Sequence, residues 1–310
     1  MSRIKAKIVH LLPYPMVLWL KRVRGWVRAI LLKVTHSKVT KEKIIEDLRK
    51  LGIREGNVLF VHSSLKSLGF VEGGADAVID ALIESVGKDG TIAMPSFTLA
   101  GSMAQTLKRG IVFNPKTSPS TVGAITEAFR KRKRVHRSIH PTHSICAFGA
   151  NAKWITNGHE NASTNFGQGT PLYKIMEADG IILGLGVEFG PVTFAHVLED
   201  TITDFPIRVY CDKEYVAKVI DVNGLEREMR IKAHDSEVAR TRIDKEEGRW
   251  IREFVTEYLS NQGFLRAGYV GGAKSWIIRA RDLFAAQKGL LAEGITFFTT
   301  RQQYEEARMG

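Results

Sequence analysis

A histidine and a glutamate three residues apart, His196 and Glu199, are the residues best suited to acid–base chemistry. Residues three apart on a helix share one face, so the two side chains could meet. A carboxylate on the far nitrogen of an imidazole fixes the tautomer and raises the basicity, which predicts a general base. An isolated His-x-x-Glu pattern is more often an ion pair on a helix surface. The pair directly follows the apolar run 181–187, where open α/β sheets build their sites, and this position favours catalysis.

Three further histidines, His136, His140 and His143, lie close together at the end of a basic run, residues 130–137. Their spacing could chelate a metal for hydrolysis, but Pro141 opposes a regular helix, and no cysteine or carboxylate cluster accompanies them. We therefore expect no metal, and we expect His140 and His143 to orient a substrate or to pack a site loop. The basic run is either a solvated surface or a docking patch for phosphates.

A polar turn joins the apolar run 58–61 to a helix that apolar residues at helical spacing predict from residue 75 onward. A strand followed by a turn of small hydroxyl residues and glycines, and then by a helix, is typical of a phosphate-binding site. An ordinary βαβ unit has the same pattern. The residues of interest in this turn are His62, Ser63, Ser64, Gly69, Gly73 and Gly74.

The remaining patterns predict an α/β fold with a central mixed β-sheet flanked by helices and a smaller β-containing C-terminal portion. Buried strands are expected at 91–94 and 181–187, and alternating residues around Asn223-Gly224 indicate a hairpin. We expect one large domain at 40–290, with its β-rich C-terminal portion at about 208–290. A basic amphipathic helical extension precedes it at 1–39, and a tail follows at 291–310.

The extension carries most of the net charge. Residues 1–41 hold ten Lys and Arg and no Asp or Glu, which leaves 35 basic against 33 acidic residues elsewhere. At 16–34, apolar residues with two tryptophans face away from the basic ones, a pattern that suits either an anionic membrane surface or packing on protein. Liposome flotation with and without residues 1–39 would decide between them. No apolar run approaches the roughly 18 residues of a spanning helix.

The nearly neutral body makes a nucleic-acid partner unexpected. The two cysteines, Cys146 and Cys211, suggest no disulfide framework, and a reduced cytoplasmic setting fits best, with the inner membrane face as a peripheral location. The oligomeric state stays open.

Several motifs together resemble the aminoglycoside 3-N-acetyltransferase family, the non-GNAT kind that uses coenzyme A. Residues 61–97, VHSSLKSLGFVEGGADAVIDALIESVGKDGTIAMPSF, are similar to its opening signature. RSIHPTHSICAFG at 137–149 resembles R-S-x-H-P-x-H-S-x-x-A-x-G, and Thr193, His196 and Glu199 match T-x-x-H-x-x-E. GGAKS at 271–275 resembles a late G-x-A-K-S motif, so the resemblance covers about 40–287.

The resemblance implies an N-acyltransferase that takes acetyl-CoA as acyl donor and acts on an amine by direct attack on the thioester. Its catalytic residues would be His196, Glu199 and His143, and its substrate-binding residues His140 and Thr193. The coenzyme A contacts that it implies are His62, Ser63, Ser64, Leu65, Ser67 and Gly69, with Ser118, Ser120 and Thr121 from a second loop.

The acceptor amine is less defined. Residues 188–191, EFGP, lack the Asp/Asn/Ser-rich approach to T-x-x-H that the family shows. Aminoglycosides are polycations that favour acidic clefts, whereas this body is nearly neutral and has a basic run. We therefore expect a nucleotide- or lipid-linked amino sugar of surface glycan synthesis. The alternatives are an aminoglycoside antibiotic acceptor (resistance), a metal-dependent hydrolase that uses His136, His140 and His143, and a non-catalytic binding module.

Overall fold

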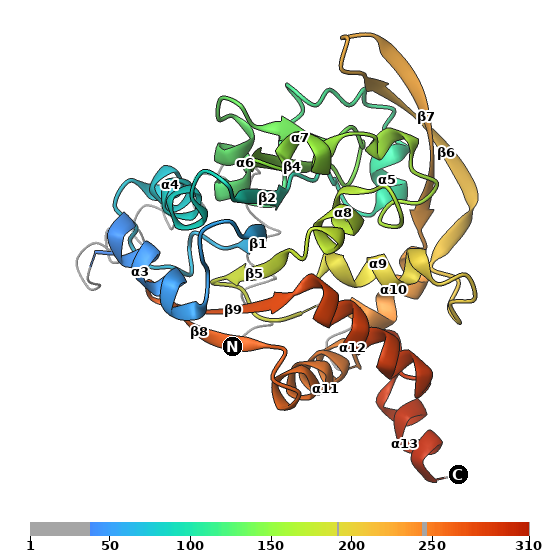
Figure 1. Ribbon diagram of the computed structural model, residues 1–310. Helices are drawn as coiled ribbons and strands as arrows, with labels where there is room; N and C mark the ends of the chain where they lie inside the picture. Colours follow the sequence, from blue (N-terminus) through green and yellow to red (C-terminus); the bar gives the residue numbers. More distant parts are fainter. Residues whose placement is uncertain (1–37, 191, 244–246, 310) are drawn as a thin grey trace, which may run out of the picture.

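A seven-stranded mixed sheet forms the centre of the protein (Figure 1). The structure is a computed structural model, and it describes residues 38–190, 192–243 and 247–309. The strands lie in the order β3-β4-β2-β1-β5-β9-β8. Their bounds are β1 Val58–Ser63, β2 Thr91–Pro95, β3 His136–Arg137, β4 Ile145–Gly149, β5 Ile181–Leu185, β8 Arg266–Val270 and β9 Ala273–Arg279.

The three central strands, β2, β1 and β5, run parallel to one another, and β4 and β9 pair antiparallel on either side. Phe60 lies opposite both Ala93 and Ile182, and the β1–β5 ladder continues to Ser63 opposite Leu185. Parallel strands place their carboxyl ends at one edge of a sheet. The predicted polar turn after β1 and the loop that leads from β5 to His196 therefore begin at the same edge.

Helices cover both faces of the sheet, and each face has its own hydrophobic core. Leu59 and Val61 point into one core, and Val58 and Phe60 into the other, which explains the uninterrupted apolar run of β1. The first core is completed by α3 Lys41–Leu51, α4 Gly74–Val86 and α6 Ala124–Arg130. The second is completed by α7 Ala152–Thr156, α8 Pro171–Glu177, α9 His196–Thr201, α11 Glu247–Asn261 and α12 Ala280–Ala292.

The sequence predicts a helix that starts with a Thr40 cap and ends near Gly52, and α3 has these ends. The Thr40 side chain accepts a hydrogen bond from the backbone N–H of Lys43 at 3.2 Å, which satisfies an otherwise unpaired donor of the first turn. Gly52 ends the helix with a φ of 119°, in the left-handed region that a side chain would disfavour.

A long hairpin, β6 Tyr210–Ile220 and β7 Glu226–His234, stands beside the central sheet as a separate two-stranded sheet (Figure 1). Its turn contains the predicted Asn223-Gly224, and Gly224 has a φ of 84°. One face packs on α5 Met103–Leu107 together with Phe113 and Ile139. The remaining short elements are the 3₁₀ turns η1 His159–Asn161 and η2 Thr193–Ala195, and the helices α10 Ser236–Ile243 and α13 Arg301–Met309.

The predicted fold class is confirmed, with two local corrections. The pattern at 271–287 predicts flexible glycines followed by a helix, but residues 273–279 form β9, because the open edge of β5 offers backbone partners to this segment. Residues 99–122 are rich in Gly, Ser, Thr and Pro and are predicted to form a loop, but they contain the short helix α5. The β-containing C-terminal portion is divided, since β6 and β7 stand apart whereas β8 and β9 extend the central sheet. The domain boundaries themselves stay a prediction.

The predicted amphipathic helix at 16–34 lies outside the described residues. Its contact with a membrane or with protein therefore stays a prediction. Among the helices that the structure does describe, none combines the length and the apolar character needed to cross a membrane.

Candidate active site

His196 and Glu199 meet at the start of α9, as the sequence predicts. His196 Nδ1 lies 2.6 Å from Glu199 Oε2, and the side chains expose 17% and 3% of their surfaces, respectively. Because a carboxylate only accepts, the proton of a neutral ring sits on Nδ1 and its lone pair on Nε2. Nε2 is therefore the nitrogen that can accept a proton from a substrate.

Phe166 brings several histidines together around this pair. Its ring stacks on His196 with centroids 4.9 Å apart, meets His143 edge-on at 5.1 Å, and stacks on His234 at 5.5 Å. We refer to His140, His143, His159, His196 and His234 as the histidine cluster. The predicted catalytic residues His196, Glu199 and His143 are therefore neighbours in space, although more than fifty positions separate His143 from the other two.

His234, at the end of β7, is a member of the cluster that sequence reasoning missed. Its ring lies 4.4 Å from that of His196 and 4.6 Å from that of Tyr210. The Tyr210 hydroxyl donates to Asp200, one turn beyond His196, at 2.7 Å. Burial raises the pKa of Asp200 to about 6. No motif marks His234, because only the docking of the hairpin brings it to α9.

His140 occupies a buried position in which both ring nitrogens have protein partners. Nδ1 accepts from the backbone N–H of His143 at 3.0 Å, so Nε2 carries the proton and donates to Asn165 Oδ1 at 3.1 Å. Burial lowers the pKa of His140 to about 4. The predicted substrate contact of His140 is not supported, because these bonds use its hydrogen-bonding capacity to shape the loop that carries His143.

His136, by contrast, is exposed on β3 and outside the cluster. The alternative metal site of His136, His140 and His143 is therefore not formed by these three residues. Within the described residues, His196, Glu199 and His234 are the one group whose ligand atoms lie within 4.8 Å of one another. The 2.6 Å hydrogen bond between His196 and Glu199 is the arrangement of a base and its orienting carboxylate. A metal bound there would have to replace the proton of this hydrogen bond.

The predicted coenzyme A turn begins where β1 ends. His62 Nε2 and Ser63 Oγ are buried there and have no hydrogen-bond partner within the described part of the chain. Further along the turn, the hydroxyls of Ser64 and Ser67 lie 2.9 Å apart. Two unpaired buried polar groups are costly in a finished structure, and they mark this turn as a place where a ligand could supply the partners.

The second predicted coenzyme A loop lies beside the same edge of the sheet. Thr121 Oγ1 donates to Phe97 O and Leu99 O, Ser118 Oγ accepts from Asn114 N, and Ser120 Oγ contacts Thr126. The hydroxyls thus hold the loop itself. Phe97 lies 4.6 Å from the His143 ring, so the loop adjoins the cluster. A largely apolar cavity of about 140 Å³ is lined by Ser118, Thr121 and Pro141, among others.

Comparison with known proteins agrees with this geometry. A family model described as aminoglycoside 3-N-acetyltransferase matches residues 60–292. The chain belongs to this family. It is 30% identical over 270 residues to aminoglycoside N(3)-acetyltransferase VII of Streptomyces paromomycinus, a match that covers 82% of this chain and 91% of the relative. The family resemblance expected from the sequence is confirmed, and so is the acyltransferase class.

Other relatives match with different coverage. The chain is 37% identical over 176 residues to the SPbeta prophage-derived aminoglycoside N(3')-acetyltransferase-like protein YokD of Bacillus subtilis, a match over 52% of this chain and 64% of that protein. The solved structure of aminoglycoside acetyltransferase AAC(3)-Xa superposes with a TM-score of 0.74 at 25% identity, over 87% of this chain and 99% of the other. AAC-IIIb, solved as a binary complex with CoASH, gives 0.72 at 26% identity over 84% and 98%.

The basic run of this family member is largely occupied by internal contacts. Arg130 bonds Glu127 at 2.6 Å, and Arg132 pairs with Asp76 and Asp80, each at 2.8 Å. Arg137 is buried and donates to Ser96 O at 2.6 Å. A docking role for phosphates is therefore not supported for these three residues, whose guanidinium groups join helices and loops of the fold.

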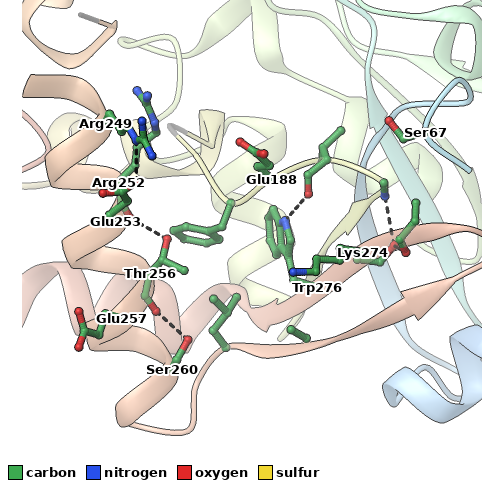
Figure 2. Close-up of a pocket in the computed structure, with 17 residues that line it drawn as sticks. Ser67, Glu188, Arg249, Arg252, Glu253, Thr256, Glu257, Ser260, Lys274 and Trp276 are labelled. Atoms are coloured by element: carbon green, nitrogen blue, oxygen red, sulfur yellow. Dashed lines mark hydrogen bonds and ion pairs between the residues drawn. The ribbon is translucent and has the colours of Figure 1, made fainter. Parts of the chain in front are cut away.

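An open cleft of about 1040 Å³ lies between β9, α11 and the loop after β5. Figure 2 shows Arg249, Arg252 and Glu253 gathered on α11 at one side and Lys274 and Trp276 of β9 on the facing side. Gly184 has no side chain, and this lets the Trp276 ring approach β5 closely, since a Cβ there would come within 2.0 Å of the ring. Ser67 of the predicted coenzyme A turn and Glu188 of the loop toward His196 also line the cleft.

Buried histidines should make the protein sensitive to mild acid. Burial lowers the pKa of His62 and of His140 to about 4, and the pKa values of His143 and His159 well below 6.5. The neutral rings thus stabilise the fold above about pH 6.5, and this contribution is lost as the pH falls toward 4, on the order of 3 kcal/mol for His62. Asp200, with its raised pKa, opposes the trend, but four histidines outweigh one carboxyl.

We expect the free energy of unfolding in urea to fall steeply between pH 7 and pH 5, before most carboxylates titrate. His62→Asn should flatten the curve, and His136→Asn, at an exposed histidine, should not change it. A wild-type stability that stays constant over this interval would contradict the prediction.

Proposed function

We propose that the protein transfers the acetyl group of acetyl-CoA to an amine of an aminoglycoside. The observation that carries this proposal is the 2.6 Å contact between His196 Nδ1 and Glu199 Oε2, within a chain whose family is named for this reaction. Acetyl-CoA supplies the acetyl group as an activated thioester. The chain itself must deprotonate the amine and hold the reactants in place.

The amine nitrogen attacks the thioester carbonyl carbon, and His196 accepts the proton of the amine at Nε2. The C–S bond then breaks, and the leaving thiolate takes up this proton and departs as the coenzyme A thiol. Glu199 keeps the other proton on Nδ1 and stabilises the imidazolium that forms, in a position where its side chain is nearly excluded from water. His143 Nδ1 lies 3.0 Å from Thr142 Oγ1, and its ring meets the Phe166 ring edge-on. We assign His143 to orienting the reactants, and Thr193, half-buried just before His196, to contact with the acceptor.

The turn 62–69 and the loop 118–121 would hold the donor. Two observations support the fit. His62 Nε2 and Ser63 Oγ offer buried polar atoms that lack a partner in the described chain, and the cavity beside Ser118 and Thr121 is apolar enough for an aliphatic arm. The loop adjoins His143 through Phe97, so a donor held there would reach the histidine cluster.

The open cleft is our candidate for the acceptor. It is bordered by the loop that leads to His196, and its lining includes the carboxylates Glu188 and Glu257. Carboxylates of this kind attract the ammonium groups of an aminoglycoside. We therefore expect Glu188→Gln to raise the KM for an aminoglycoside several-fold, with an unchanged KM for acetyl-CoA.

The experiment is release of the coenzyme A thiol by wild type, followed with an aminoglycoside panel and with nucleotide-linked amino sugars. Glu84→Gln, on α4 and outside the cleft, is the control for Glu188→Gln. Turnover of aminoglycosides supports the proposal. Turnover of neither acceptor class would refute the proposed reaction. Equal KM values of Glu188→Gln and Glu84→Gln for the aminoglycoside would refute the proposed cleft.

A nucleotide- or lipid-linked amino sugar is the second candidate, and one observation favours it. The cleft holds three cations, Arg249, Arg252 and Lys274, against three carboxylates, so its charges balance. A polycation gains little from a neutral cleft, whereas an acceptor that carries phosphates could use the cations. Turnover of the nucleotide-linked sugar without turnover of aminoglycosides would establish this reading in place of the first.

A further inference from the structure

A buried glutamine on α12, Gln287, lies behind the pair that the proposed function makes catalytic. The residue is 6% exposed, and its Nε2 lies 3.4 Å from Ala195 O, the carbonyl directly before His196. Because a carbonyl oxygen only accepts, the amide nitrogen must be the atom that faces Ala195. The amide oxygen Oε1 therefore points away from Ala195. It is buried and has no hydrogen-bond partner among the residues that the structure describes.

A small cavity lies between this glutamine and Glu199. Its volume is about 20 Å³, and its other walls are mostly apolar side chains such as Leu198, Val255 and Leu290. One water needs at least about 10–15 Å³, so a single molecule fits. A purely apolar cavity of this size would stay dry, but here two polar residues, Gln287 and Glu199, are among those that line it.

The chemistry of the two oxygens decides what can join them. Both the Gln287 amide oxygen and the Glu199 carboxylate accept hydrogen bonds, so neither can satisfy the other directly. Water has two protons and can donate one to each. A buried polar group without a hydrogen bond destabilises the fold, and a buried water can supply that hydrogen bond.

We propose that one buried water links Gln287 Oε1 to the Glu199 carboxylate, and that Gln287 is a positioning residue for the pair His196–Glu199. This inference rests on the proposed function. Through Nε2, Gln287 holds the carbonyl from which α9 starts, and through the water it orients the carboxylate and favours its charged form. One side chain of α12 thus supports both His196 and Glu199, although it contacts no substrate.

Kinetics of Gln287→Met and a high-resolution crystal structure of the full chain test the proposal. Methionine has a similar volume but lacks the amide. We expect kcat to fall about ten-fold while the KM for acetyl-CoA is unchanged, since a lost buried hydrogen bond acts on the chemical step. Leu290→Ala, an apolar change on the same helix and in the same cavity, should lower the unfolding midpoint and leave kcat at the wild-type value.

The crystal structure should show a water within hydrogen-bond distance of both Gln287 Oε1 and Glu199. A cavity without ordered density, a wild-type kcat for Gln287→Met, or an equal loss of kcat in Leu290→Ala would overturn the inference. The last outcome would assign the effect to packing. If the wild type transfers no acetyl group, the proposed function fails, and the crystallographic result still decides whether the water is present.

Discussion

Replacing His196 by alanine should lower kcat/KM for acetyl transfer by about 10²- to 10⁴-fold, the usual contribution of a positioned general base. The ring is held by Glu199 at 2.6 Å and by stacking on Phe166, so its Nε2 is aimed by contacts on two sides. Alanine removes the proton acceptor and leaves the turn after β1 and the loop 118–121 in place. The dissociation constant of acetyl-CoA, measured by calorimetry, should therefore stay near its wild-type value.

His136→Ala is the matched control, since it removes an exposed histidine that lies outside the cluster. Its activity should equal that of wild type. If His196→Ala retains wild-type kcat/KM, the base lies elsewhere, and His143 becomes the next candidate because it adjoins the same Phe166 ring. If His196→Ala loses acetyl-CoA binding together with activity, then the residue supports the site rather than the proton transfer.

Replacing Arg137 by methionine should lower the free energy of unfolding by about 3 kcal/mol, because buried hydrogen bonds from a charged donor are lost at several acceptors together. The guanidinium donates to Ser96 O at 2.6 Å, to Ser144 Oγ at 3.0 Å and to Ser118 O, and it lies 4.9 Å from the Phe113 ring. Burial lowers the pKa of Arg137 to about 10, so the group stays charged at neutral pH.

The same substitution should weaken acetyl-CoA binding, since Arg137 anchors the loop 118–121 to the end of β2. Urea denaturation and calorimetry on the same preparation measure the two effects. Lys133→Met removes an exposed cation of the same run and should change neither quantity. Unchanged stability in Arg137→Met would mean that solvent replaces the guanidinium at its carbonyl partners. Loss of stability without loss of affinity for acetyl-CoA would show that the loop 118–121 does not belong to the donor site.

Local patterns determined much of the architecture. The short apolar run at 58–61 predicted a strand, Thr40 predicted the start of α3, and Asn223-Gly224 predicted the hairpin. In each case the deciding interactions lie within a few residues, so the sequence contains them directly. The spacing of His196 and Glu199 belongs to the same class, because one helical turn is enough to bring them together.

Contacts between distant segments were decided by tertiary packing alone. β9 forms because β5 offers an open edge, although its local pattern also suits the start of a helix. Arg137 belongs to a run that reads as a charged surface, yet the loops around it supply carbonyl acceptors that turn it inward. The local pattern of charge and hydrophobicity does not indicate which backbone groups of a distant segment will lie opposite a given residue.

The sequence by itself determined the family, the fold class and the pair His196–Glu199, because motifs and short-range spacing carry that information. Only the tertiary structure added His234, brought by the hairpin to 4.4 Å from His196, and Gln287, brought by α12 to the carbonyl of Ala195. The hairpin packs on α5, and α12 packs against α9, in both cases through burial of apolar surface. The hydrophobic effect is non-directional, so no pattern within either element states which polar atoms that packing will bring to the site.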